Sequence, residues 1–116
     1  MKLSMNQATC LEKSSLEKDL ELCEKYGYDM IEPRTMDGIP NYLKNHTIDE
    51  LAAWFKSHKV KPLAFNTLCF FNNRTPEDYQ KVLQELRQMC EHLLKLMQLY
   101  SFCFIITDIL QKHKVQ

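Results

Sequence analysis

Three stretches of the chain repeat an apolar residue every three or four positions, the spacing typical of a helix with one buried face. The first stripe runs over residues 16–23 and is followed by Gly27, which can end a helix in a left-handed conformation. The second stripe covers residues 48–55, and the third covers residues 79–93. The pattern therefore predicts three helices.

Each predicted helix is preceded by a start signal. Ser14 and Thr47 are each followed three residues later by a glutamate, which predicts two capping boxes. In such a box the hydroxyl accepts the glutamate amide, and the carboxylate accepts the amide of the cap residue. Thr75 stands before Pro76, which suits a cap followed by proline at the first helical position. We expect the helices to begin directly after Ser14, Thr47 and Thr75.

Short apolar segments between these helices predict strands. Residues 2–5 suit a first strand and residues 28–32 a second, whereas residues 36–40 have the composition of a turn. Pro62 precedes a continuous apolar run over residues 63–71, which fits a strand covered on both faces. Residues 99–110 form the longest apolar run, which falls short of the ~20 residues of a membrane span, and we interpret it as a fourth, buried strand.

Strand-like segments thus begin near residues 2, 28, 62 and 99. A (β/α)₈ TIM barrel of about 250 residues has a repeat of roughly 30. The spacing predicts an α/β fold, a partial barrel with the first three to four β/α units and parallel strands. Four strands do not close such a barrel by themselves.

Polar side chains follow the predicted strands and are the candidate site residues. Asn6 with Gln7 ends the first strand, Glu32 and Arg34 end the second, and Asn66 lies toward the end of the third. In a parallel array these ends share the face where barrel enzymes collect substrate groups. The alternative, which the residues alone favour because surface pairs are common, is that Glu32 and Arg34 form a solvated ion pair of little energetic weight.

Composition excludes several classes of function. Fifteen Lys and Arg balance fifteen Asp and Glu, so the positive field of a nucleic-acid binder is absent and no such partner is expected. The five cysteines form no C-x-x-C pair, which indicates reduced intracellular thiols. The N-terminus turns polar too early for a signal peptide. The four histidines show no helical metal pair, and two glycines make no phosphate loop. We expect a cytoplasmic protein without membrane contact.

Several runs in the first 92 residues carry a family resemblance. These are Met1-Lys2-Leu3, Asn6-Gln7-Ala8-Thr9, residues 19–25, Glu32 with residues 34–37, residues 61–66 and residues 70–74. Over about residues 1–92 the chain resembles the N-terminal part of inosose (keto-inositol) isomerases, members of the xylose-isomerase-like sugar phosphate isomerase/epimerase TIM barrels.

The resemblance implies an enzyme of inositol catabolism that moves a proton between adjacent carbons of a cyclic polyol ketone or related ketose. It implies a divalent metal (Zn, Mn or Co) that polarises substrate oxygens, and carboxylates that accept and donate the proton. The family's metal ligands lie on later strands, so no metal is expected to bind this chain. Asn6, Glu32, Arg34 and Asn66 would then contribute to substrate binding, and no catalytic residue is assigned.

Two departures from the family pattern stand out. Pro33 removes a backbone donor where the family usually continues the second strand, which is tolerable only at a strand end. From about His92 the likeness is lost, and residues 93–116 form a divergent apolar tail that could serve as an aberrant fourth strand. We hypothesise that a frameshift or early stop replaced the rest of the barrel.

The tail leaves a second reading open. In this second hypothesis the chain is a non-catalytic truncated product, which self-associates through uncovered barrel edges or pairs with a missing C-terminal half. A third hypothesis is a function like that of the type IV apurinic endonucleases, which share the barrel architecture. The zero net charge counts against it.

Overall fold

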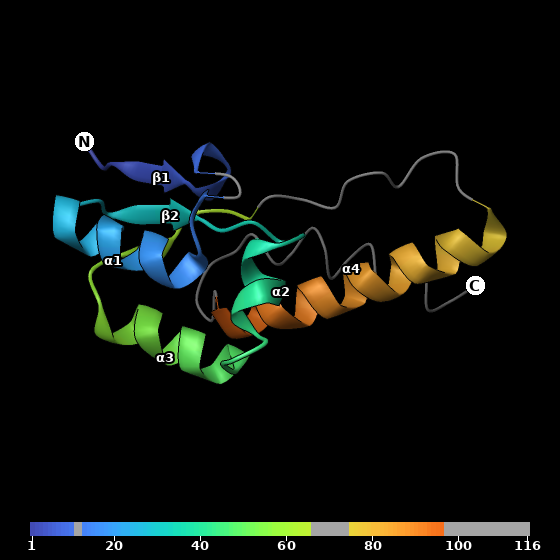
Figure 1. The fold of residues 1–116 in the computed structure, drawn as a ribbon. Coiled ribbons are helices and arrows are strands. Elements are labelled where there is room, and N and C mark those ends of the chain that lie inside the picture. Colours follow the sequence, from blue (N-terminus) through green and yellow to red (C-terminus); the bar gives the residue numbers. More distant parts are fainter. Residues whose placement is uncertain (11–12, 66–74, 97–116) are drawn as a thin grey trace.

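The described part of the chain alternates strands with helices around one small parallel sheet (Figure 1). The computed structural model describes residues 1–10, 13–65 and 75–96. In chain order its elements are β1 (Ser4–Asn6), the 3₁₀ turn η1 (Gln7–Thr9), α1 (Leu16–Tyr26), β2 (Met30–Glu32), α2 (Gly38–Tyr42), α3 (Ile48–Ser57), β3 (Lys61–Pro62) and α4 (Pro76–Leu96).

The sheet has the strand order β1-β2-β3, and both pairings are parallel. Met5 lies opposite Ile31, and Asn6 opposite Glu32. On the other side of β2, Ile31 lies opposite Pro62. The predicted parallel β/α array is therefore confirmed for the described residues, and the carboxyl ends of its strands share one edge.

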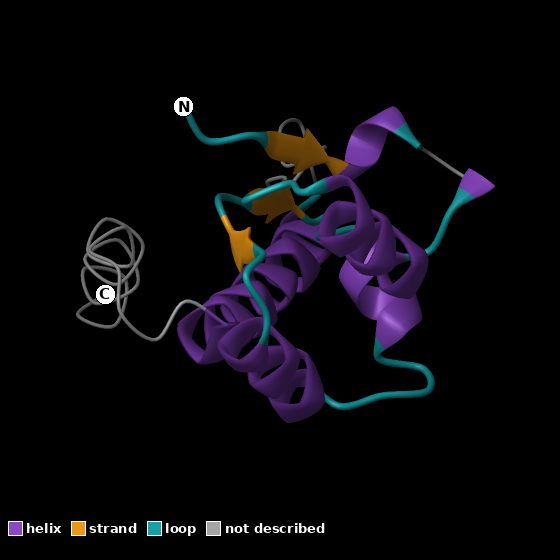
Figure 2. Cartoon of the chain, turned by 90° about the vertical axis from the view of Figure 1, so that its left-hand side faces the viewer, coloured by secondary structure: helices purple, strands orange, loops and turns teal. Residues whose placement is uncertain are grey.

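The described helices cover one face of this sheet (Figure 2). Ile31 is fully buried against them, and Met5 packs on the same cluster. Side chains alternate between the two faces of a strand, so Asn6 and Glu32 point to the opposite face, where no described helix lies. The core between sheet and helices contains Leu16, Leu20, Cys23, Ile31, Ile39, Tyr42, Leu51, Ala52, Phe55, Val60 and Leu96.

The helix ends follow most of the predicted signals. Thr47 forms the expected capping box, in which its hydroxyl accepts the Glu50 amide at 3.2 Å and its amide donates to the Glu50 carboxylate at 2.6 Å. Thr75 caps α4 by accepting the Asp78 amide at 3.2 Å. Gly27 ends α1 in the left-handed conformation, with φ 74°. These three predictions are confirmed.

The capping box predicted at Ser14 is wrong. The cap of α1 is Ser15, whose hydroxyl accepts the Lys18 amide at 3.3 Å. Ser14 instead donates its hydroxyl to the fully buried carboxylate of Asp19, with the two oxygens 2.6 Å apart. Two adjacent serines satisfy the same local pattern. Because Ser14 is bound to the buried carboxylate of Asp19, Ser15 caps the helix.

Two further predictions are corrected. The segment expected to be a turn contains the start of α2. Pro40 is compatible with this helix because it falls in the first helical turn, where a missing amide hydrogen costs nothing. The third strand begins at Lys61 and includes Pro62, and it is not covered on both faces, since the side chain of Leu63 is 48% exposed. Residues 66–71 of the predicted strand lie outside the described residues.

The C-terminal part of the described chain is helical. α4 extends to Leu96 and packs with its last turns on α3, while its first half reaches away from the sheet (Figure 1). The predicted tail therefore starts inside a helix, and the predicted strand at residues 99–110 lies outside the described residues. Among the described helices, none is sufficiently long and apolar to span a membrane.

Candidate functional site

Asn6 and Glu32 form the polar pair at the carboxyl edge of the sheet. Their strands place them opposite each other on the face that the helices leave uncovered. The Asn6 side-chain amide donates to Glu32 Oε2, with the nitrogen and the oxygen 3.2 Å apart. Asn6 is exposed and Glu32 is half-buried. The predicted rim pair is therefore brought together.

The orientation of the Asn6 side chain is fixed by its own strand end. Its Oδ1 accepts the backbone amide of Ala8 at 2.9 Å, which caps η1. The amide nitrogen must then face Glu32, and its second hydrogen is left for another acceptor. Glu32 in turn uses one carboxylate oxygen for Asn6. The pair therefore presents an N–H donor beside a carboxylate acceptor.

Gln7, the next residue along, supports this edge from the core side. Its side chain is 4% exposed, and its Oε1 accepts the backbone amide of Arg34 at 2.8 Å. That hydrogen bond joins the end of β1 to the segment after β2. A Cβ at Gly38 would lie 2.2 Å from the same Gln7 Oε1, so a side chain at this position would displace the Gln7 side-chain amide. The sequence predicts Gln7 on the rim, and no local pattern indicates this bracing role, because the contact spans 27 residues.

Arg34 is held by the loop that follows β2. Its Nη2 lies 2.7 Å from Asp37 Oδ2, and the arginine side chain is 25% exposed. The ion pair of Arg34 is thus with Asp37 and not with Glu32, unlike the solvated pair considered from the sequence. Pro33, between Glu32 and Arg34, is fully buried just past the last residue of β2, where its missing donor is tolerated. Asn66 lies outside the described residues.

The described residues do not assemble a metal centre. Among them, no group of three or more His, Cys, Asp or Glu side chains has an arrangement that could hold an ion. At the rim, Glu32 is accompanied by an amide and not by further carboxylates or imidazoles. The described residues therefore supply no ligand set for the metal that the family resemblance implies.

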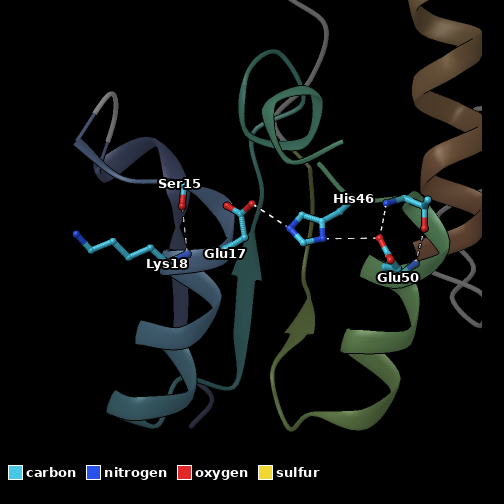
Figure 3. A network of polar contacts seen from close by, with 6 residues as sticks. Ser15, Glu17, Lys18, His46 and Glu50 are labelled. Carbon is cyan, nitrogen blue, oxygen red and sulfur yellow. Dashed lines mark hydrogen bonds and ion pairs between the residues drawn. The ribbon is translucent and has the colours of Figure 1, made fainter. Parts of the chain in front are cut away.

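A second polar network lies away from the rim and joins α1 to α3 (Figure 3). The His46 ring sits between two carboxylates, with Nε2 3.6 Å from Glu17 and Nδ1 3.7 Å from Glu50. It also stacks on Tyr42 of α2, with ring centroids 4.5 Å apart. The carboxylates and burial raise the pKa of Tyr42, burial being the larger cause. This network braces three helices.

A hollow of about 430 Å³ lies between α2 and α4. Its walls include Ile39 and Leu43 on one side and Met89 and His92 on the other. Burial lowers the pKa of His92, which favours the neutral imidazole. The hollow belongs to the helix layer, and neither Asn6 nor Glu32 lines it.

Comparison with known proteins gives this rim a context. No family model matches the chain. The inosose isomerases of Bacillus velezensis and Bacillus subtilis are each 55% identical to it over 91 residues, and that of Halalkalibacterium halodurans is 57% identical over 91 residues. The chain is similar to the inosose isomerases. The predicted resemblance is therefore confirmed, and the matched part spans 78% of this chain but only 32% to 33% of these relatives.

A solved structure supports the same conclusion for the fold. A crystal structure of the IolI protein with a bound zinc atom is 53% identical and superposes with a TM-score of 0.75. The match covers 83% of this chain and 34% of that protein. The three-stranded parallel sheet with its outer helices is accordingly a partial α/β barrel, as predicted. The uncovered face that carries Asn6 and Glu32 corresponds to the inside of the barrel.

Proposed function

We propose that this chain supplies the substrate-side rim of a metal-dependent isomerase that moves a proton between adjacent carbons of a keto-inositol or a related ketose. The hydrogen-bonded pair of Asn6 and Glu32 carries the proposal, because it lies on the inner face at the carboxyl edge of a parallel barrel sheet. Similarity to inosose isomerases supplies the reaction class.

The pair suits a neutral polyol chemically. Each hydroxyl group of a polyol both donates and accepts a hydrogen bond, so two neighbouring hydroxyls can meet one amide N–H and one carboxylate oxygen. Glu32 would accept from one hydroxyl while Asn6 donates to the other, which orients the ring without covalent chemistry. Arg34 and Asn66 belong to the same proposed rim, with the Arg34 guanidinium held in place by Asp37.

In this proposal the metal and the proton-transferring carboxylates belong to the complete enzyme. The relative of known structure binds zinc, and Zn, Mn or Co would polarise the substrate carbonyl there. This chain alone is proposed to bind no such ion and to lack turnover. The proposed barrel portion is residues 1–92, and residues 93–116 are the proposed divergent tail. The proposed location is the cytoplasm, where the cysteines of this chain would stay reduced.

The test is a nuclear magnetic resonance titration of the full chain with a keto-inositol. The side-chain amide of Asn6 should shift on addition of the ligand, and Glu32→Gln should weaken binding by about tenfold, since a charged acceptor is lost. Glu21→Gln, at an exposed position on α1, is the matched control and should leave binding unchanged. Ligand shifts that bypass Asn6, or equal effects of the two variants, would sink the proposal.

Turnover is tested separately. The purified chain is assayed for keto-inositol isomerisation with Zn²⁺, Co²⁺ or Mn²⁺, and its mass in solution is measured alongside. We expect no turnover. Isomerisation by a monomer would show that the chain carries its own proton-transfer groups, against this part of the proposal.

A second candidate is a non-catalytic chain that self-associates through its uncovered barrel edges. The exposed Leu63 beside β3 favours it, because a sheet edge next to an apolar side chain invites pairing. Light scattering across a concentration series decides the matter, since a constant monomer mass is incompatible with self-association.

A further inference from the structure

The charge of Arg34 at the rim is compensated by a residue of its own loop. Arg34 Nη2 lies 2.7 Å from Asp37 Oδ2, and the two side chains are 25% and 43% exposed. Among the described residues, no second carboxylate lies within ion-pair distance of Arg34. Glu32, two residues earlier, accepts from Asn6 instead. The guanidinium is therefore neutralised from the loop and not from the sheet.

The Asp37 carboxylate does not serve the helix that it precedes. Asp37 is the cap residue of α2, a position at which an aspartate usually accepts an amide of the first helical turn. Here its side chain makes no such hydrogen bond. Its Oδ1 is buried and, within the described residues, accepts no hydrogen bond. The partner that the structure gives this carboxylate is thus Arg34.

Backbone contacts hold both ends of this ion pair. The Arg34 amide donates to Gln7 Oε1 at 2.8 Å, and the Arg34 carbonyl accepts the Ile39 amide at 2.9 Å. The Asp37 carbonyl accepts the Asn41 amide at 2.9 Å. The two backbones are in place before the side chains meet, which lowers the entropy cost of the ion pair.

This arrangement treats charged and uncharged ligands differently. A free guanidinium binds phosphate well, because its planar fork matches two phosphate oxygens. A phosphate at Arg34 would either lie beside the negative charge of Asp37 or displace it, and displacement would leave a carboxylate with one buried oxygen unpaired. A neutral hydroxyl can accept from another N–H of Arg34 while Asp37 stays in place. The loop therefore favours uncharged polyols over phosphate esters.

We propose that Asp37 is a specificity-determining residue of the rim, which holds the Arg34 guanidinium and thereby keeps phosphate groups from binding to it. Asp37 acts through Arg34 and is in this sense a positioning residue. The inference rests on the proposed function for the place of Arg34 in the substrate rim.

The experiment titrates the full chain and its Asp37→Asn variant with inorganic phosphate at low ionic strength. Nuclear magnetic resonance follows the side-chain Nε–H of Arg34. Asparagine keeps the shape of aspartate and removes the charge, so the variant should bind phosphate at Arg34 at least about fivefold more tightly than the parent does. The partial exposure of the pair limits the gain, because water screens the charges. Equal phosphate affinities of the two chains overturn the inference.

Matched variants separate this effect from a general change of charge. Asp78→Asn removes the same charge from an exposed pair on α4, in which Asp78 lies 3.6 Å from Lys81, and should leave phosphate binding at Arg34 unchanged. Asp37→Glu keeps the carboxylate and should bind phosphate more weakly than Asp37→Asn does. Adding Arg34→Gln to Asp37→Asn should abolish the gain. A gain with Asp78→Asn, or one that survives Arg34→Gln, contradicts the inference.

Circular dichroism checks that each variant folds as the parent does. If Asp37→Asn does not fold, the parent chain decides, because its Arg34 Nε–H should not shift in millimolar phosphate. A phosphate-dependent shift of that resonance in the parent overturns the inference without any variant.

The outcome is separable from the proposed function when a keto-inositol is titrated in parallel. A gain of phosphate binding in Asp37→Asn, without keto-inositol binding by the parent, supports the role of Asp37 and contradicts the proposed function. Keto-inositol shifts at Asn6 without any gain of phosphate binding support the proposed function and contradict the role of Asp37.

Discussion

Gly38→Ala tests how the strand ends are held in place. A Cβ at this position would lie 2.2 Å from Gln7 Oε1, far inside van der Waals contact. Gln7 is a flexible residue in principle, but its side chain is 4% exposed and its Oε1 holds the Arg34 amide at 2.8 Å. Making room for the methyl group therefore means breaking that hydrogen bond.

The expected cost follows from three contributions. Overpacking a buried site costs about 1–3 kcal/mol, and leaving a buried polar group unpaired costs about 1–3 kcal/mol. Alanine is a better helix former than glycine by about 1 kcal/mol, which offsets part of this at the start of α2. We expect Gly38→Ala to lower the free energy of unfolding by about 2 kcal/mol, and Tm by roughly 5–15 °C.

Urea unfolding followed by the fluorescence of Trp54, the single tryptophan, measures the effect. Gln7→Ala should remove the obstruction, so the double variant should lose at least about 1 kcal/mol less than the sum of the single variants. Gly27→Ala is the control, because φ 74° makes it costly while no atom lies within 4 Å of its Cβ. Its effect should add to that of Gln7→Ala. A neutral Gly38→Ala, or additivity of Gly38→Ala with Gln7→Ala, would refute the reasoning.

Three further outcomes are expected. Thr47→Ala removes a helix cap and should cost about 1 kcal/mol in urea unfolding. The Leu3 amide, and then Lys59, lower the pKa of Asp29. Its contribution is therefore complete above the unfolded pKa of about 4 and is lost as pH falls below it, so Asp29→Asn should flatten the acid limb of the stability curve. Burial raises the pKa of Cys23 to about 11, so its thiol stays protonated at pH 8 in the folded chain. Iodoacetamide at pH 8 should therefore alkylate Cys23 only when the chain unfolds, and the rate of alkylation in urea should follow the rate of unfolding.

The sequence predicted those parts of the fold that short-range rules control. The cap at Thr47 follows from residues three apart, and the left-handed Gly27 follows from the loss of the apolar stripe beyond it. The approach of Asn6 to Glu32 followed from one further rule, that parallel strands end at a common edge. No long-range detail was needed for these predictions.

Other features depend on contacts that no local pattern encodes. Ser14 and Ser15 are equivalent as caps until the buried carboxylate of Asp19 takes the first one. Gly38 suits a turn by composition, yet its φ is not in the left-handed region, and the reason for a glycine there is the space filled by Gln7. The choice of helix cap and the need for a glycine at position 38 both depend on a buried polar side chain from elsewhere in the chain.

The adjacent residues Asn6 and Gln7 make different contacts at the end of β1. Asn6 faces the inside of the barrel and meets Glu32, whereas Gln7 is buried and meets the Arg34 amide. A slip of β1 by one residue would exchange their faces. It would put the longer amide into the rim and leave the shorter one unable to reach Arg34 from the core. The buried glutamine thus fixes the register that presents Asn6 to Glu32, and the geometry of the rim depends on a residue that does not face it.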